Sequence, residues 1–292
     1  ELPEYSSTTG NSHLDKKVTH IEFTPSEVYT FYRPDIEIDS DIGYAIEAIM
    51  EEMEKMQAAD MSLDSFPRKD VPEMFKKVRS EVIKRIYAFK DDNAYPIKPE
   101  KLIIDVRSAL NHDDIVISDV GTHKLWISKV YQTFEPNTCI IPNGFASMGF
   151  ALPGAISAKL AYPEKSIVAM TGDGGFLMNV QEIETAVRLK LSVIIIVWAD
   201  NDYNLISTKQ KHEFGTSVFT EFGNPDFVQI AESFGAVGFH AKSTQEFLRH
   251  LESAKKTADK PVVIAVDVDY SRNEVLLDDA FPLYIDSLNH KK

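Results

Sequence analysis

Two aspartates and a run of glycines carry the clearest chemical signal in the sequence. Asp173 lies within Gly172-Asp-Gly-Gly175, and Asp200 opens Asp200-Asn-Asp202, 27 residues further along. A strand, a helix and a second strand fit that interval, so the two aspartates can end neighbouring parallel strands roughly 5 Å apart. Carboxylates that close repel, and one is pushed towards its protonated form. A hard cation such as Mg2+ removes the conflict, because it prefers oxygen ligands and completes its shell with phosphate oxygens and water.

The glycines beside Asp173 fit the same interpretation. Gly174 and Gly175 are expected to precede a helix, where backbone N–H groups can approach a phosphate. Asp173 is expected at a surface strand end. A plain strand-to-helix turn, with Asp200 as a solvated loop acid, is the simpler alternative, but the two motifs together favour a metal-diphosphate site. A dinucleotide loop is disfavoured, because Leu177 occupies the third glycine position of that fingerprint.

The elements that must position these residues alternate after Pro99. Strand-like runs cover 115–119, 139–143, 166–173, 192–200, 236–241 and 261–269, and helical patterns cover 100–110, 122–131, 148–161, 177–190, 226–234 and 244–257. Asn224-Pro225 is expected to cap one helix, and Ser243-Thr-Gln-Glu246 has capping-box spacing. The alternation predicts an α/β fold with a doubly wound, mostly parallel six-stranded sheet and helices on both faces.

Composition and net charge exclude several classes of function. The net charge of −14 argues against a nucleic-acid or anionic-membrane surface. A single cysteine, Cys139, excludes a disulfide framework within the chain and fits a reducing, cytoplasmic location. No apolar run reaches the length of a membrane span. The first residue is Glu rather than Met, so we expect a fragment of a longer protein.

Several longer stretches agree with one family in order and spacing. They are Thr171-Gly-Asp-Gly-Gly-Phe-Leu177, Glu182-Ile-Glu-Thr-Ala-Val-Arg-Leu189, Asp200-Asn-Asp-Tyr-Asn204, Phe222-Gly-Asn-Pro-Asp-Phe227 and Ala231-Glu-Ser-Phe-Gly235. These resemble the thiamine-diphosphate-dependent acetolactate synthases, especially the FAD-independent catabolic type. The resemblance is strong over residues 100–275 and weak over 18–57. It implies four parts: a flexible N-terminus and middle-domain tail (1–57), a helical linker (58–98), the thiamine-diphosphate domain (99–275) and a C-terminal tail (276–292).

The resemblance also implies the cofactors, thiamine diphosphate and Mg2+, and the residues that hold them. Asp173 and Asp200 would bind Mg2+ through their side chains, and Asp202 through its backbone carbonyl. The diphosphate would contact Gly174, Gly175, Tyr203 and Asn204 on one side and Thr122 and His123 on the other. The segment from Asn143 to Met148 would hold the cofactor bent, with Met148 as a wedge between its rings and the carbonyl of Ala146 accepting from the aminopyrimidine.

Other interpretations exist for single residues. Core packing would also explain Met148, a surface position would explain His123, and Tyr203 could cap the core. Cys139 and Trp198 are expected in the core.

Three departures from the family matter. Asp202 stands where the family usually has Gly, so a positive φ there would be costly. Lys209 stands where a neutral residue is expected beside the substrate. The family's activating glutamate belongs to an N-terminal domain that nothing here resembles.

The expected function is therefore the cofactor-binding part of an enzyme that decarboxylates a 2-oxo acid, such as pyruvate, and ligates it to a second one. The alternatives are simple decarboxylation, or a cofactor-binding domain that is inactive by itself. The expected partner is an activating domain from the same or a neighbouring subunit of a homo-oligomer.

Overall fold

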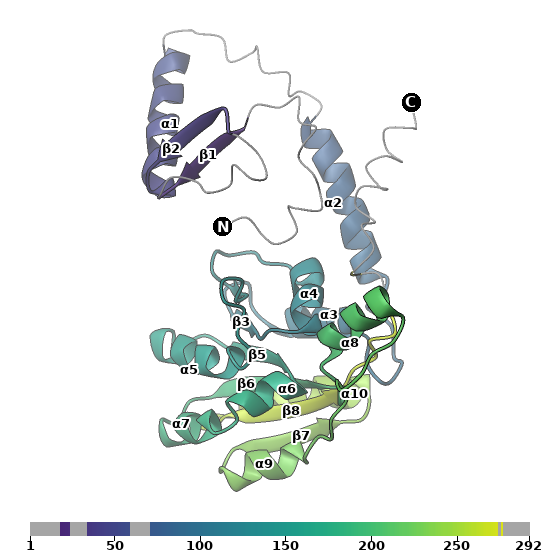
Figure 1. Ribbon diagram of the computed structural model, residues 1–292. Helices are drawn as coiled ribbons and strands as arrows, with labels where there is room; N and C mark the ends of the chain where they lie inside the picture. Colours follow the sequence, from purple (N-terminus) through teal and green to yellow (C-terminus); the bar gives the residue numbers. More distant parts are fainter. Residues whose placement is uncertain (1–17, 24–33, 59–70, 274–275, 277–292) are drawn as a thin grey trace. The chain divides into compact units, whose positions relative to one another are not determined.

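The computed structural model describes residues 18–23, 34–58, 71–273 and 276 (Figure 1). Residues 1–17 and 24–33 of the predicted N-terminal part, residues 59–70 of the predicted linker, and all but Leu276 of the predicted C-terminal tail lie outside this range. The chain divides into two compact units, Glu1–Lys76 and Lys77–Lys292.

The first unit contains a parallel pair of strands and a helix. β1 (Thr19–Glu22) pairs with β2 (Ile36–Asp39), and α1 (Ile42–Ala58) contacts β1. α1 carries several apolar side chains, yet Ile42, Tyr44 and Met50 are more than half exposed. Helix α2 (Val71–Tyr87) crosses the division between the units.

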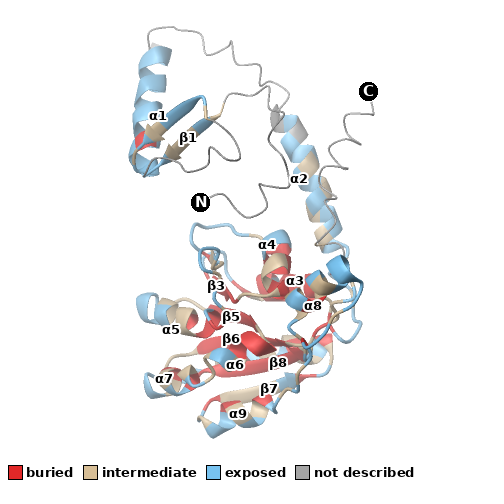
Figure 2. Ribbon diagram, in the orientation of Figure 1, coloured by how far each residue is buried: buried red, intermediate tan, exposed pale blue. Residues whose placement is uncertain are grey.

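The second unit is built on the predicted six-stranded parallel sheet. Its strands are β3 (Ile115–Ser118), β4 (Cys139–Ile140), β5 (Ile167–Gly172), β6 (Val193–Ala199), β7 (Val237–Ala241) and β8 (Val262–Asp267). Their order is β4-β3-β5-β6-β8-β7, and every pair is parallel. The central strands are buried on both faces, as their unbroken apolar runs require (Figure 2).

Helices cover both faces of the sheet and enclose two cores. One core lies under α3 (Pro99–Ala109), α4 (Thr122–Val130) and α10 (Thr244–Lys256). The other lies under α5 (Ala151–Ala161), α6 (Asp173–Met178), α7 (Glu182–Arg188) and α9 (Phe227–Ser233). Trp198 is fully buried, as expected, and Cys139 packs partly buried against the first core.

Several local expectations differ from the structure. The single helix expected over 177–190 is two helices, α6 and α7. Helix α6 begins at Asp173, so Gly174 and Gly175 lie inside its first turn rather than before it. Helix α8 (Asn204–Phe214) was not among the predicted elements. The cap of α9 is Asp226, which accepts from the N–H groups of Val228 and Gln229, and not Asn224. Ser243 does cap α10, accepting from the N–H of Glu246.

The direction in which the chain winds changes between β3 and β5. These strands are neighbours, but the helix after β3 packs on one face of the sheet and the helix after β5 packs on the other. Such switch points are where open α/β sheets bind ligands. Among the described residues, none of the helices is both long and apolar enough to cross a membrane.

Candidate cofactor and metal site

Asp173 stands at the turn from β5 into α6 and joins several loops. Its Oδ1 accepts from the N–H of Gly174 at 2.8 Å. Its Oδ2 accepts from the N–H groups of Asp200 and Asn201 at 3.1 and 2.8 Å and from the amide of Asn224 at 2.7 Å. Asp173 is only 2% exposed. The expected surface position is therefore wrong, because the loops that follow β5 and β6 close over the carboxylate.

Asp200 follows the neighbouring strand, so the two carboxylates do meet at one edge of the sheet. Burial, and next the charge of Asp173, raises the pKa of Asp200 to about 7. Its Oδ2 accepts from the amide of Asn204 at 2.7 Å, and a backbone hydrogen bond from Asp202 offsets part of the rise in its pKa. The predicted conflict between paired carboxylates is thus present, and Asp200 is the one pushed towards its protonated form.

The side chain of Asp202 faces helix α8 and not the carboxylates of Asp173 and Asp200. Its Oδ2 accepts from the hydroxyl of Ser207 in the first turn of α8. The left-handed residue in this turn is Asn201, with φ of 60°. The strain expected at Asp202 is therefore absent, since Asn tolerates this conformation better than most residues. Among the described residues, no three His, Cys, Asp or Glu side chains cluster as metal ligands.

The glycines of the motif are required by close neighbours. A Cβ on Gly174 would lie 2.8 Å from the ring of Tyr203 and 3.4 Å from the methyl group of Met148. A Cβ on Gly175 would lie 2.9 Å from Oδ1 of Asp119. The first turn of α6 therefore brings together three segments that the sequence predicted to share a site.

Asp119, the residue directly after β3, binds the end of the loop from Asn143 to Met148, which was expected to hold the cofactor bent. Its carboxylate accepts from the N–H groups of Val120, Gly149 and Ala151 at 2.7–2.9 Å. The same loop contains Ala146, whose φ of 49° is unusual for a residue with a side chain. Sequence reasoning named Asp119 only as a strand end. The polar Asp119-Val-Gly-Thr-His123 run after the strand was the one available signal.

Met148 lies at the end of this loop. It is half-buried and belongs to neither core cluster.

Thr122 and His123 open α4 and are both buried. The hydroxyl of Thr122 donates to Oδ1 of Asn204 at 2.9 Å. The surface alternative for His123 is wrong, since the residue is 3% exposed. Burial lowers the pKa of His123 to about 4, against the opposing charge of Asp119. Its imidazole is therefore neutral near pH 7, and its buried Nε2 has no partner among the described residues.

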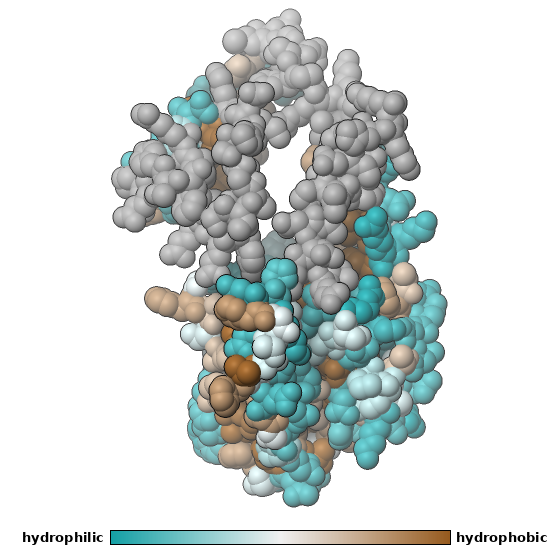
Figure 3. All heavy atoms as spheres, turned by 45° about the vertical axis from the view of Figure 1, so that its right-hand side comes forward, coloured by the Kyte–Doolittle hydropathy of each residue, from teal (hydrophilic) through white to brown (hydrophobic). Residues whose placement is uncertain are grey.

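Tyr203 is 40% exposed and packs its ring against Phe222, with ring centroids 4.8 Å apart. Two phenylalanines in loops at this end of the sheet, Phe145 and Phe219, are fully exposed. Figure 3 shows that brown, hydrophobic surface is interspersed with hydrophilic side chains on the face drawn there.

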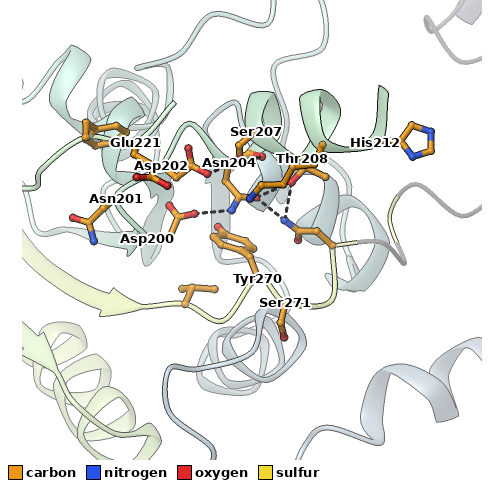
Figure 4. Close-up of a pocket in the computed structure, with 14 residues that line it drawn as sticks. Asp200, Asn201, Asp202, Asn204, Ser207, Thr208, His212, Glu221, Tyr270 and Ser271 are labelled. Atoms are coloured by element: carbon orange, nitrogen blue, oxygen red, sulfur yellow. Dashed lines mark hydrogen bonds between the residues drawn. The ribbon is translucent and has the colours of Figure 1, made fainter. Parts of the chain in front are cut away.

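A pocket of about 830 Å³ opens beside the aspartates, between α8 and the segment after β8 (Figure 4). Its lining residues are Asp200, Asn201, Asp202, Asn204, Ser207, Thr208, Lys211, His212, Glu221, Phe222, Val268, Tyr270, Ser271 and Asn273. Lys209 is exposed and is not among them. The cation on this wall is Lys211, one of several lining residues that sequence reasoning did not single out.

Comparisons with known proteins identify the family of this chain. The family described as "Thiamine pyrophosphate enzyme, C-terminal TPP binding domain" matches residues 119–266. The chain is 33% identical over 279 residues to "Acetolactate synthase" of Bacillus subtilis, covering 96% of this chain and 47% of that protein. It is 32% identical to "Acetolactate synthase, catabolic" of Raoultella terrigena, covering 94% and 47%. The chain thus spans about half the length of these relatives.

One solved structure shares the fold. It is a thiamine diphosphate-dependent 4-hydroxybenzoylformate decarboxylase from Rhodococcus jostii RHA1, with a TM-score of 0.56 and 23% identity, covering 60% of this chain and 33% of that one.

Proposed function

Because the chain belongs to the thiamine pyrophosphate enzymes through their C-terminal cofactor-binding domain, we propose that it anchors the Mg2+-diphosphate end of thiamine diphosphate in an acetolactate-synthase-like enzyme. One observation carries the metal assignment. Asp173 and Asp200 end adjacent strands, and burial, together with the charge of Asp173, raises the carboxyl pKa of Asp200 to about 7. A divalent cation between them would supply the opposite charge.

The residues present fit these groups. Oδ1 of Asp173 accepts from a single N–H, that of Gly174, and Oδ2 of Asp200 accepts from the amide of Asn204. Both carboxylates would bind the metal, and the backbone carbonyl of Asp202 would complete the protein's share. These hard oxygen donors suit Mg2+, which keeps its remaining positions for phosphate and water.

The diphosphate would lie between two groups of residues. Gly174, Gly175, Tyr203 and Asn204 would contact one side, and Thr122 and His123 the other. The buried, unpartnered Nε2 of His123 supports this, since a polar atom there lacks the hydrogen bond that burial normally requires. Met148 and Ala146, in the loop that Asp119 fixes, would support the rings.

When bound, thiamine diphosphate supplies the electron sink for decarboxylating a 2-oxo acid. The contribution of this chain is to neutralise the diphosphate, fix its position and bury it. The acetolactate synthase relatives support pyruvate as the substrate and a second 2-oxo acid as the acceptor. The activating glutamate would come from another domain, of the same or a neighbouring subunit in a homo-oligomer, because this chain spans only half of those relatives.

The test compares this chain with the longer protein that contains it. Each is supplied with thiamine diphosphate, Mg2+ and pyruvate, and both CO2 and acetolactate are measured. The longer protein should form both products, whereas this chain should bind the cofactor weakly and release no CO2. CO2 without acetolactate from the longer protein would indicate simple decarboxylation. Turnover by this chain alone would contradict the proposed division between domains.

A further inference from the structure

A line of hydrogen bonds leads from the core to the proposed metal site. The indole N–H of Trp126, on α4, donates to Oδ1 of Asn273 at 2.9 Å. The amide Nδ2 of Asn273 donates to Oδ1 of Asn204, and Nδ2 of Asn204 donates to Oδ2 of Asp200. We call these four residues the amide relay. Figure 4 shows its outer part as dashed lines between α8, Asp200 and the segment after β8.

The indole end of the amide relay fixes its direction. An indole N–H can only donate, so the atom of Asn273 that faces it must be the amide oxygen. Each Asn amide carries one acceptor end and one donor end, so the order of donors and acceptors can run one way only, from Trp126 to Asp200. A flip of either amide would place two donors or two acceptors against each other.

Neighbouring hydroxyls reinforce the orientation of Asn204. Its Oδ1 also accepts from Thr122 at 2.9 Å and lies 3.3 Å from the hydroxyl of Thr208. Its Nδ2 is left with two N–H bonds that face the other way. One donates to Asp200, and the second is available to an anion. With the opposite orientation, a carbonyl oxygen would face both the carboxylate and the diphosphate.

We infer that Asn273 and Trp126 are positioning residues, which orient the amide of Asn204 so that it presents donors to Asp200 and to the diphosphate. This inference rests on the proposed cofactor site. Trp126 is 2% exposed and lies outside the pocket, whereas Asn273 is 6% exposed and lines the pocket. Through Oδ2, the amide relay would fix the orientation of the Asp200 carboxylate toward the cation.

The chain offers a matched control. It has two tryptophans, and both are buried. The indole N–H of Trp198 has no hydrogen-bond partner among the described residues. Trp126→Phe and Trp198→Phe therefore remove the same group from buried sites, but only the first breaks the amide relay.

The first measurement needs no cofactor. In 1H–15N spectra of the whole chain without ligands, Trp126→Phe should shift the side-chain amide signals of both Asn273 and Asn204. Trp198→Phe should leave both in place. If Trp126→Phe shifts Asn273 alone, orientation is not transmitted and the inference fails. Because this result is independent of ligand, it separates the amide relay from the proposed function, which fails if the wild-type chain does not bind Mg2+ and thiamine diphosphate together.

The second measurement is the Mg2+ dependence of thiamine diphosphate binding, by calorimetry. Trp126→Phe should weaken Mg2+ binding by about tenfold or more, the usual effect of losing a group that orients a ligand, and Trp198→Phe should change it by less than about threefold. Equal effects would overturn the inference.

Asn273→Asp provides a second variant if Trp126→Phe folds poorly. The new carboxylate still accepts from Trp126 but cannot donate to Asn204. Its added negative charge alone would strengthen Mg2+ binding, whereas loss of the amide orientation should weaken it. Weaker binding with an unchanged Trp126 indole signal supports the amide relay, and stronger binding refutes it.

Discussion

At the scale of single residues, Asp173 has two roles that a substitution can separate. Its charge is proposed to bind the metal, and its oxygens satisfy the N–H groups of Gly174, Asp200 and Asn201 and the amide of Asn224. Buried donors left without an acceptor destabilise a protein by about 1–3 kcal/mol each. A change that deletes the side chain therefore removes both roles at once.

Asp173→Asn should lower Mg2+-dependent thiamine diphosphate binding at least about a hundredfold with a small loss of stability, because the amide oxygen still accepts. Asp173→Ala should lose binding and also about 3 kcal/mol of unfolding free energy. Calorimetry and urea unfolding measure the two effects. Binding by Asp173→Asn that equals the wild type would refute the metal assignment.

If the pocket binds the proposed substrate, we expect Lys211 rather than Lys209 to contact it. Both lie on α8 and both are exposed, but only Lys211 lines the pocket. In the longer protein, Lys211→Gln should lower kcat/KM for pyruvate by about threefold to tenfold, since a charge-assisted contact to a carboxylate is weakened by solvent. Lys209→Gln makes the same charge change two residues away and should leave kcat/KM unaltered. Equal losses would show a general effect of charge, not a contact in the pocket.

At the scale of elements, the short loop before α9 shows how adjacent polar residues divide their tasks. Asn224 turns inward to Asp173, and Asp226 caps the helix by accepting from the N–H groups of Val228 and Gln229. The sequence pattern of Asn before Pro had predicted that Asn224 caps the helix. The cap shifts because the amide of Asn224 is taken by a buried carboxylate, and Asp is an equally good cap.

Variants of these two residues should have opposite consequences. Asp226→Ala should lower the free energy of unfolding by about 1 kcal/mol and leave Mg2+-dependent cofactor binding intact. Asn224→Ala should weaken that binding by about tenfold, because a group that orients Asp173 is lost. Thermal unfolding and calorimetry on both proteins give the comparison. A binding defect in Asp226→Ala as large as that in Asn224→Ala would contradict the division.

At the scale of the whole molecule, the second unit takes in chain that precedes the predicted domain start at residue 99. Ile97 is fully buried, donates its N–H to the carbonyl of Asp267 and accepts from the N–H of Asp269. The hydroxyl of Tyr95 lies 2.5 Å from the Asp267 carboxylate. This segment therefore pairs with the chain at the carboxyl end of β8, which continues into the wall of the pocket.

Two shortened proteins test where the domain begins. A protein starting at Lys77 should keep the stability of this unit, whereas one starting at Pro99 should lose about 2–5 kcal/mol, the usual cost of removing a buried Ile side chain. Urea unfolding, followed by circular dichroism, measures the difference. Equal stabilities would place the boundary at 99, as the sequence predicts.

The sequence by itself determined the family, the parallel sheet and the meeting of Asp173 with Asp200. Those features depend on local patterns: apolar runs, glycines and an interval that fits one crossover. Lys209 shows the limit of such reasoning, because its spacing from the motif could not say which side of α8 faces the pocket.

Only the tertiary structure decided which polar groups satisfy one another. Asn224 lies 51 residues from Asp173, and Asn273 lies 147 residues from Trp126, yet each pair shares a hydrogen bond. Such contacts leave no periodic trace in a sequence, since any Asn can serve as a cap, a surface residue or a buried partner. These bonds are needed because folding buries the polar groups of segments that are far apart in the sequence.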